Sequence, residues 1–372
     1  MLSVGIIGLP NVGKSTLFNA LLGRELALTG KHPFTTIDKN NGVVSVPDPR
    51  LNHLKKIGAE LAKIKPEEIE VVPAAIKLID IAGLVKGAHL GEGLGNEFLG
   101  HIREVEAIIH LLRGFNSSIP HLMGNVDPVR DLEIVETELI LKDLETINKV
   151  QSAKVKAQNY SEKLKTTLDK IKKDLNNGVM VKDQRLSEKE REEIKELFLL
   201  TDKPVLYVLN VSEEQLTVHA GKATIADENL VKKLKEKVGS FLVISAKLES
   251  ELHQLTEDEA KEYRNELGIK KSSLEEIVAE GYKILDLITF FTIAKGKKVS
   301  AWSLEKGRSV VEAAGRVHTD FAKGFIKAEV IDYQELAQIG SWLEAKKKGR
   351  IKMVGRDYQV VDSDVIEFKF SV

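Results

Sequence analysis

The chain has 372 residues, of which 42% are hydrophobic and 30% charged, and its formal net charge is −1. This length allows two or three domains with hydrophobic cores, and the near-zero charge argues against a protein that coats nucleic acid through bulk electrostatics. The absence of cysteine excludes disulfides and thiolate metal sites. Because the first residues lack a signal-peptide pattern and no stretch approaches the roughly 18 apolar residues that span a bilayer, we expect a cytoplasmic protein with no membrane partner.

The first predicted elements are a buried strand over 4–7 and a helix whose apolar residues begin at Leu17. Helical patterns separate several further stretches of apolar residues. These stretches predict buried strands over 76–81, 107–112, 205–209 and 241–244. Strands that alternate with helices indicate an α/β fold with a mostly parallel sheet covered on both faces.

The segment from about 131 to 200 is charged and predicts helices. Apolar residues recur in steps of three and four over 140–150 and again over 164–175, which is typical of a coiled-coil seam. We expect a helical hairpin inserted into the α/β domain, which reverses at 176–179 and returns as a helix through Ile194, Leu197 and Phe198. Two ordinary amphipathic surface helices are the alternative interpretation.

A third region begins near Ile284. The stretch DLITFFTI at 286–293 is apolar and rich in strand-forming residues, whereas 316–331 and 360–370 mix strand and turn signals. This pattern predicts a small α+β domain at the end of the chain.

The residues from Gly8 to Ser15, GLPNVGKS, match G-x-x-x-x-G-K-[ST] between a predicted strand and a predicted helix. In this context the backbone amides and the positive end of the helix bind phosphate groups. Lys14 can reach the β- and γ-phosphates, and the Ser15 hydroxyl can bind Mg²⁺. The sequence therefore predicts a site for a magnesium nucleotide.

Two later segments can complete this site. HPFTTID at 32–38 supplies Thr35 and Thr36, and a threonine hydroxyl on Mg²⁺ would make the segment a nucleotide-dependent switch. A plain polar loop is the alternative for this segment. Asp80 ends the strand of IKLIDIAG and can hold Mg²⁺ through its water shell, while the Gly83 amide can meet the γ-phosphate.

The pattern departs from ordinary Ras-like GTPases at two places. Leu84 stands where a glutamine positions the attacking water, so hydrolysis is absent or another residue orients the water. At 210–213 the chain reads NVSE instead of N-K-x-D, so the lysine is a valine and the acid is one methylene longer. Guanine recognition is weakened accordingly, although 245–247 keeps the SAK segment that usually packs under the base.

Together these motifs resemble the YchF-type Obg-like ATPases. The motifs are GLPNVGKST, PFTTID, DIAGLVKGAHLGEGLGNEFL, NVSE and SAKLE. The inserted arm and the C-terminal domain, which resembles a TGS domain of the β-grasp type, extend the resemblance over nearly the whole chain. The resemblance implies a P-loop fold of the translation-factor class that hydrolyses ATP in preference to GTP and acts as a ribosome-associated switch in translation or stress regulation.

The resemblance and the motifs together predict the site residues. The expected ATP contacts are Asn11, Val12, Gly13, Lys14, Ser15, Thr16, Gly83, Asn210, Val211, Glu213, Ser245 and Ala246. The expected Mg²⁺ ligands are Ser15, Thr36 and Asp80, and Asn11 is a candidate ligand for an activating K⁺ ion. Two positions differ from the family pattern, since Thr35 replaces its cysteine and Lys39 its proline.

The family places a catalytic histidine on a loop after the next strand, which implies His121. An ordinary surface residue is the alternative for His121. His89 is the rival catalytic residue, and His110 is expected to be structural.

The expected domains are a nucleotide-binding domain over 1–130 and 201–282, an arm over 131–200 and a TGS domain over 283–372. Basic clusters in the last domain are either solvated faces or contacts to rRNA phosphates. The clusters are Lys295, Lys297 and Lys298, and Lys346 to Lys348 with Arg350. A GTPase of the same fold and a regulatory module that binds nucleotide without hydrolysis are the competing functions.

Overall fold

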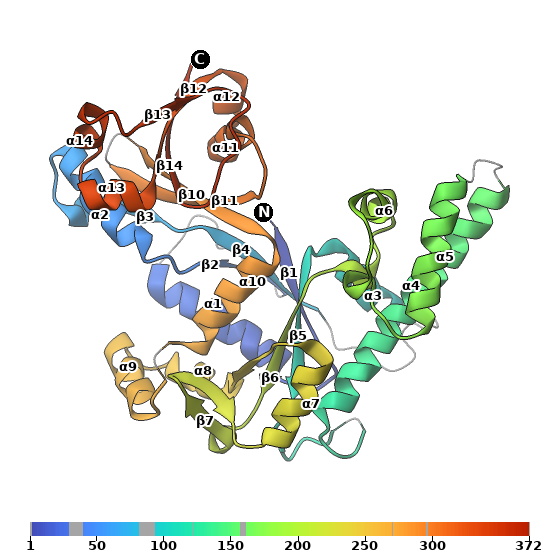
Figure 1. The fold of residues 1–372 in the computed structure, drawn as a ribbon. Helices are drawn as coiled ribbons and strands as arrows, with labels where there is room; N and C mark the ends of the chain where they lie inside the picture. The colour runs from blue at the N-terminus through green and yellow to red at the C-terminus, as the bar shows by residue number, and fades with distance from the viewer. Residues whose placement is uncertain are drawn as a thin grey trace. The chain divides into compact units, whose positions relative to one another are not determined.

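Figure 1 shows the computed structural model, which describes residues 2–29, 40–81, 94–121, 123–156, 161–269, 271–294 and 297–371. The chain divides into two compact units. The first contains Met1–Val44 and Lys77–Gly281, and the second contains Ser45–Ile76 and Tyr282–Val372. Among the described residues, no helix has the length and apolar character needed to cross a lipid bilayer.

The first unit is built on a six-stranded sheet in the order β2-β4-β1-β5-β6-β9. Its strands are β1 (Ser3–Ile7), β2 (Asn41–Ser45), β4 (Ala75–Asp80), β5 (Ala107–Arg113), β6 (Val205–Asn210) and β9 (Leu242–Ile244). The pairs β1 with β4, β1 with β5, β5 with β6 and β6 with β9 are all parallel. Every residue of β1 and β5 is buried, as parallel strands covered on both faces require. The predicted α/β fold is confirmed, whereas β2, which has only two apolar residues, was not predicted.

Helices and a small hairpin surround this sheet. They are α1 (Lys14–Thr29), α3 (Leu94–Glu104), α7 (Glu228–Val238), α8 (Ala246–Leu252), α9 (Glu257–Glu266), the hairpin β7 (Leu216–His219) with β8 (Lys222–Ile225), and α10 (Ser273–Ile284), which runs across the boundary between the units. Helix α7 illustrates how the sequence positions them. Asp227 caps its start by accepting a hydrogen bond from the Leu230 amide. Leu230 and Leu234, four residues apart, then pack on the core that includes Tyr207 and Leu209 of β6.

The arm consists of α4 (Pro128–Lys156), α5 (Glu162–Asn176) and the short α6 (Glu188–Ile194). Helices α4 and α5 pack side by side (Figure 1) around a core of their own that includes Ile140, Ile147, Leu168 and Ile171. The coiled-coil seam is therefore present, but the chain already reverses between Lys156 and Glu162. The predicted reversal at 176–179 is present, because α5 ends at Asn176 and α6 runs back along it through the pairs Lys163–Glu193 and Lys170–Glu190. The earlier reversal between α4 and α5 was missed, since the seam has the same periodicity on both helices and no glycine or proline marks it.

The return of the arm also differs from the prediction. After α6 the chain forms two short 3-10 helices, η4 (Lys195–Leu197) and η5 (Leu200–Asp202). Phe198 lies between them in the left-handed region, with a φ of 48°, and its side chain is 63% exposed. The buried carboxylate of Asp143 in α4 accepts hydrogen bonds from the amides of Leu200 and Thr201 at 2.9 and 2.8 Å. The end of the arm is therefore held to α4 by these polar contacts and not by the packing of a returning helix.

The second unit contains a six-stranded mixed sheet in the order β13-β12-β14-β10-β11-β3. Its elements are α2 (Arg50–Ala62), β3 (Glu70–Val72), β10 (Leu287–Ala294), β11 (Lys298–Glu305), α11 (Val310–Val317), α12 (Thr319–Lys323), β12 (Phe325–Asp332), α13 (Tyr333–Ile339), α14 (Trp342–Lys347), β13 (Lys352–Val354) and β14 (Asp364–Phe370). Strands β10 and β14 pair in parallel at the centre, flanked by antiparallel partners. The predicted β-rich C-terminal domain is confirmed, and this strand order is compatible with a β-grasp module.

Residues 45–76 belong to this second unit, so the expected nucleotide domain over 1–130 is wrong for this stretch. Strand β3 pairs with β11, with Val71 opposite Val299. In α2, the Arg50 guanidinium lies 3.0 Å from the Asp362 carboxylate, and His53 Nδ1 lies 2.7 Å from the Tyr333 hydroxyl. These partners are more than 200 residues away in the sequence, so no local pattern reveals them.

Candidate nucleotide site

The phosphate-binding loop occupies the turn between β1 and α1. Gly8 and Gly13 have φ angles of 152° and 97°, which side chains rarely adopt. A Cβ on Gly8 would lie 2.4 Å from the Leu111 carbonyl oxygen, and one on Gly13 would lie 2.4 Å from Asn210 Nδ2. Both glycines are therefore required by close approach as well as by conformation. Asn11 has a left-handed backbone, with a φ of 62°, and is exposed.

Lys14 starts α1 and is buried beneath the loop. Its Nζ donates hydrogen bonds to the carbonyl oxygens of Gly8 at 3.2 Å and Leu9 at 3.0 Å. Burial lowers the pKa of Lys14 to about 8, although the nearby Asp80 carboxylate opposes this effect. A desolvated ammonium held by neutral carbonyls is suited to bind an anion, because a phosphate would replace weak partners with strong charge-assisted ones.

Ser15 and Asp80 form the candidate metal site. The Ser15 hydroxyl donates a hydrogen bond to Asp80 Oδ2 at 2.8 Å. The other carboxylate oxygen, Asp80 Oδ1, is buried without a hydrogen-bond partner among the described residues. Two hard oxygen ligands with an unused acceptor fit a magnesium ion, which prefers carboxylate and hydroxyl oxygens. The other predicted groups near the γ-phosphate, Thr36 and Gly83, lie outside the described residues, as do Leu84 and His89.

On the base side, Asn210 connects the two predicted nucleotide segments. Its side-chain amide donates to the Val12 carbonyl at 2.9 Å, and its Oδ1 accepts from the Ala246 amide at 2.9 Å. Both polar atoms of the buried Asn210 side chain are therefore used to hold the phosphate-binding loop against the 245–246 segment. Asn210 thus acts on the site by positioning other groups. Thr16 is exposed in the first turn of α1.

The remaining base-side residues are placed on neighbouring turns. The Val211 amide donates to the Ile244 carbonyl at 2.8 Å, and its side chain is buried. Glu213 accepts a hydrogen bond from the Tyr263 hydroxyl at 2.8 Å. Ser245 caps α8 by accepting from the Leu248 amide.

His121 is buried, with 7% of its surface exposed, so the interpretation as an ordinary surface residue is wrong. Its Nε2 lies 2.7 Å from Asp131 Oδ2 in the first turn of α4, and its Nδ1 accepts from the Met123 amide at 3.1 Å. Because Nδ1 accepts, the Nε2 proton is donated to Asp131. Both ring nitrogens are thus occupied by protein groups in this conformation.

Two buried polar residues of β5 lie next to the phosphate-binding loop. His110 is buried and its Nε2 has no hydrogen-bond partner among the described residues, while burial and then the charge of Lys14 lower the pKa of His110 to about 3. Arg113, the last residue of β5, is 1% exposed and bonds the Asn11 carbonyl. Sequence reasoning missed Arg113, although a charged residue that ends an otherwise apolar strand was a usable signal.

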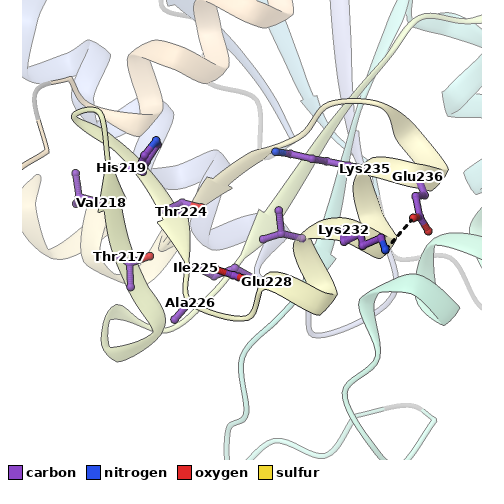
Figure 2. Close-up of a pocket in the computed structure, with 11 residues that line it drawn as sticks. Thr217, Val218, His219, Thr224, Ile225, Ala226, Glu228, Lys232, Lys235 and Glu236 are labelled. Carbon is purple, nitrogen blue, oxygen red and sulfur yellow. Dashed lines mark ion pairs between the residues drawn. The ribbon is translucent and has the colours of Figure 1, made fainter.

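Figure 2 shows an open pocket of about 710 Å³ between the β7–β8 hairpin and α7. Val218, His219 and Lys235 are among its lining residues, and Lys232 pairs with Glu236 at 4.0 Å. None of the predicted nucleotide contacts lines it. The chemistry of the phosphate-binding loop, and not the size of this pocket, therefore identifies the candidate site.

The parallel sheet, the glycine-dependent loop, the buried Lys14 and the Ser15–Asp80 pair define a P-loop nucleotide-binding protein. A family model described as a 50S ribosome-binding GTPase, MMR_HSR1, matches residues 3–140. A second model, YchF-GTPase_C, described as a protein of unknown function (DUF933), matches residues 287–371.

Full-length relatives are more specific. The Ribosome-binding ATPase YchF of Bacillus subtilis is 40% identical over 379 residues and covers 100% of both chains. The protein of the same name from Escherichia coli O157:H7 is 42% identical over 377 residues, which are 99% of both chains. The solved structure of the Schizosaccharomyces pombe YchF GTPase is 34% identical, with a TM-score of 0.85, over 99% of this chain and 97% of that one. The chain belongs to the YchF family, which confirms the resemblance found in its motifs.

Proposed function

We propose that this chain is a ribosome-binding ATPase that hydrolyses ATP with Mg²⁺ and acts as a nucleotide-dependent switch in translation or stress regulation in the cytoplasm. The observation that carries the proposal is the buried Lys14, which is held by two carbonyl oxygens beneath a loop built for phosphate. Full-length membership of the YchF family supports the same conclusion. The test is phosphate release from ATP. If the wild-type protein releases no phosphate, the proposed ATPase activity is refuted.

ATP is proposed as the preferred nucleotide over GTP. Guanine recognition by N-K-x-D needs an aspartate that accepts from two guanine donors, whereas Glu213 is one methylene longer, shares one oxygen with Tyr263, and has no lysine before it at 211. Adenine would meet the Val211 carbonyl, with Ser245 and Ala246 under the ring. The name of the Schizosaccharomyces pombe relative makes GTP the second candidate. Calorimetric titration with both nucleotides separates them, and tighter binding of GTP would contradict the proposal.

Ser15, Asp80 and Thr36 are proposed to hold Mg²⁺, which when bound neutralises phosphate charge. Asp80→Asn tests this role, because it keeps the shape of the side chain and removes its charge. We expect ATP affinity to fall about tenfold with Mg²⁺ present and to change little in its absence. A matched loss under both conditions would assign Asp80 a purely structural role.

Asn11 is proposed as the ligand of an activating K⁺ ion, since its exposed side chain sits on the left-handed turn of the loop. The amides of Val12 to Thr16 and of Gly83 would bind the phosphates beside it. Phosphate release in K⁺ compared with Na⁺ tests the role, and Asn11→Ala should abolish any difference. Equal rates in both salts for the wild type would refute K⁺ activation.

His121 is proposed to support hydrolysis in place of the glutamine that Leu84 replaces. Because both ring nitrogens are occupied, His121 must leave Asp131 before it can contact water at a phosphate. His121→Ala should lower turnover and leave ATP affinity unchanged, and His89→Ala serves as the comparison for the rival residue. Full ATP turnover by His121→Ala would refute the role of His121 but would leave the proposed ATPase activity intact.

Ribosome contact is proposed through the arm and the C-terminal unit. Much of the basic charge there is neutralised internally, since Lys298 pairs with Glu70 at 2.8 Å, and Lys346 with Glu329 at 2.7 Å. Trp302 donates to Thr292 and is half-buried, which favours packing over base stacking. Co-sedimentation with ribosomes, with and without ATP, tests ribosome binding. Equal recovery of the protein in the pellet when ribosomes are absent would contradict the proposed binding.

A further inference from the structure

Arg113 makes an unusual set of contacts for a buried cation. Its Nη1 donates to the Asn11 carbonyl at 3.3 Å, and its Nε donates to the Phe115 carbonyl at 3.1 Å. Its Nη2 donates to Ser117 Oγ at 3.0 Å and to the Ile119 carbonyl at 2.9 Å. The guanidinium also lies over the Phe115 ring, 4.8 Å from its centroid.

These contacts join two segments that are far apart in the sequence. One is the phosphate-binding loop at Asn11, and the other is the segment 114–121 that ends at His121. Among the described residues, no carboxylate forms an ion pair with Arg113, so neutral acceptors alone satisfy its charge. Taking a cation out of water is unfavourable unless its donors are well used, and a planar fork of five N–H groups on three nitrogens can reach acceptors that lie too far apart for the single nitrogen of a lysine.

The same segment is held at both of its ends. At its start, the Gly114 amide donates to the Asn210 carbonyl at 2.7 Å, and Gln215 Nε2 donates to the Gly114 carbonyl at 2.9 Å. At its end, His121 is held by Asp131 at 2.7 Å. Between these anchors Arg113 provides the contact with the phosphate-binding loop itself, and through Ile119 it reaches within two residues of His121.

We infer that Arg113 is a positioning residue that sets the segment carrying His121 in register with the phosphate-binding loop at Asn11. The inference rests on the proposed function and deepens it. When His121 leaves Asp131, the Arg113 contacts still hold Ser117 and Ile119 to the Asn11 carbonyl, which limits how far the histidine can move from the phosphate-binding loop. A one-ångström error in such placement can lower a reaction rate about a hundredfold.

The test is Arg113→Lys in the full chain, because lysine keeps the charge and loses the fork. Steady-state ATP hydrolysis and affinity for a non-hydrolysable ATP analogue are measured in the wild-type and His121→Ala backgrounds. We expect kcat to fall about tenfold with KM changed less than about twofold. In the His121→Ala background, Arg113→Lys should cause no further loss, because Arg113 acts through the histidine segment.

Arg356→Lys is the matched control. Arg356 also donates to a backbone carbonyl, that of Phe325 at 3.2 Å, and its guanidinium lies 6.0 Å from the ring of the same residue, but it belongs to the second unit. Its turnover should equal that of the wild type. Ser117→Ala removes a single acceptor of Arg113, and we expect a smaller fall in kcat, about twofold, with the melting temperature kept. This variant decides the question if Arg113→Lys does not fold.

The outcomes separate the two claims. A wild-type protein that does not hydrolyse ATP refutes the proposed function. A fall in turnover of the same size with and without the His121 side chain overturns the inference and leaves the proposed function standing. A rise in KM that accounts for the whole loss in kcat/KM also overturns it, because Arg113 would then support only the shape of the phosphate-binding loop.

Discussion

Lys14 in the first unit and Arg50 in the second are both withdrawn from water, but their partners differ in kind. Lys14 is buried and donates to two neutral carbonyl oxygens. Arg50 is half-buried and lies between two carboxylates, 2.7 Å from Asp48 and 3.0 Å from Asp362, and stacks over Phe291. Burial alone lowers both pKa values, yet the carboxylates raise the pKa of Arg50 above its ordinary value whereas Lys14 falls to about 8.

This difference in partners indicates that Lys14 is available to bind a ligand, whereas Arg50 stabilises the fold. The charge of Arg50 is already neutralised, so it stabilises the attachment of 45–76 to the C-terminal strands. The charge of Lys14 is poorly compensated, which favours the uptake of an anion. His121 belongs to the nucleotide-binding unit, but its hydrogen-bonding groups already have protein partners, as those of Arg50 do. Asp131 and the Met123 amide occupy its two ring nitrogens.

The largest effect should come from Lys14→Met. Methionine keeps much of the apolar stem and removes the ammonium, so we expect ATP affinity to fall about a hundredfold, or ~3 kcal/mol. Calorimetric titration measures the affinity. Lys149→Met, at an exposed lysine of the arm, is the control. A loss below about threefold would mean that the loop amides alone bind the phosphates.

Arg50→Met should have the next largest effect, on stability and not on nucleotide binding. It leaves the Asp48 side chain, which is 8% exposed, without its main partner, and we expect unfolding of the second unit to become easier by about 2 kcal/mol. Both tryptophans, Trp302 and Trp342, belong to this unit, so a denaturant titration followed by tryptophan fluorescence reports on it.

Arg308→Met is the matched control for that measurement. Arg308 also pairs with two carboxylates, Glu305 and Glu312, but its side chain is 49% exposed. Such surface pairs contribute about 0–1 kcal/mol. An equal loss of unfolding free energy in Arg50→Met and Arg308→Met would contradict the structural role of Arg50. Reduced ATP affinity in Arg50→Met would contradict the distinction between Arg50 and Lys14.

Nucleotide binding should be coupled to proton uptake by Lys14. The pKa of Lys14 is about 8 in the free protein, and a bound phosphate should return it toward 10.5. Between these values the complex holds more protons than the free protein, so affinity falls as the pH rises, by up to about tenfold per pH unit. Calorimetry at about pH 7 and pH 9 in buffers of different ionisation enthalpy detects the uptake. The same dependence in Lys14→Met would assign it to another group.

The smallest effect is expected for Asp131→Asn. An amide oxygen accepts the Nε2–H of His121 more weakly than a carboxylate does, so His121 leaves more readily and turnover should rise about threefold. Asp127→Asn is the control, because Asp127 caps the same turn of α4 without contacting His121. A fall in turnover as large as that of His121→Ala would instead mean that Asp131 orients the histidine during the reaction.

Much of the first unit was predictable because its signals are local. The apolar runs of β1, β4, β5, β6 and β9 and their separation by helices predicted the parallel sheet within a residue or two at most ends. The arm shows the limit of such signals. Periodicity predicts its seam and glycine predicts its turn at 176–179, but nothing local indicates the reversal between Lys156 and Glu162, because periodicity does not depend on the direction of the chain.

The phosphate-binding loop is predictable because contiguous residues between a strand and a helix carry its signal, and Asp80 is predictable because it ends a buried apolar strand. The resemblance to the YchF family likewise depends on short local motifs. Three features are visible in the folded chain alone: 45–76 joins the C-terminal strands, Asp131 holds His121, and Arg113 bonds the carbonyl of Asn11. The reason is physical. A buried charge or ring takes its character from the partners that the fold brings to it, and these partners are distant or irregularly spaced along the chain.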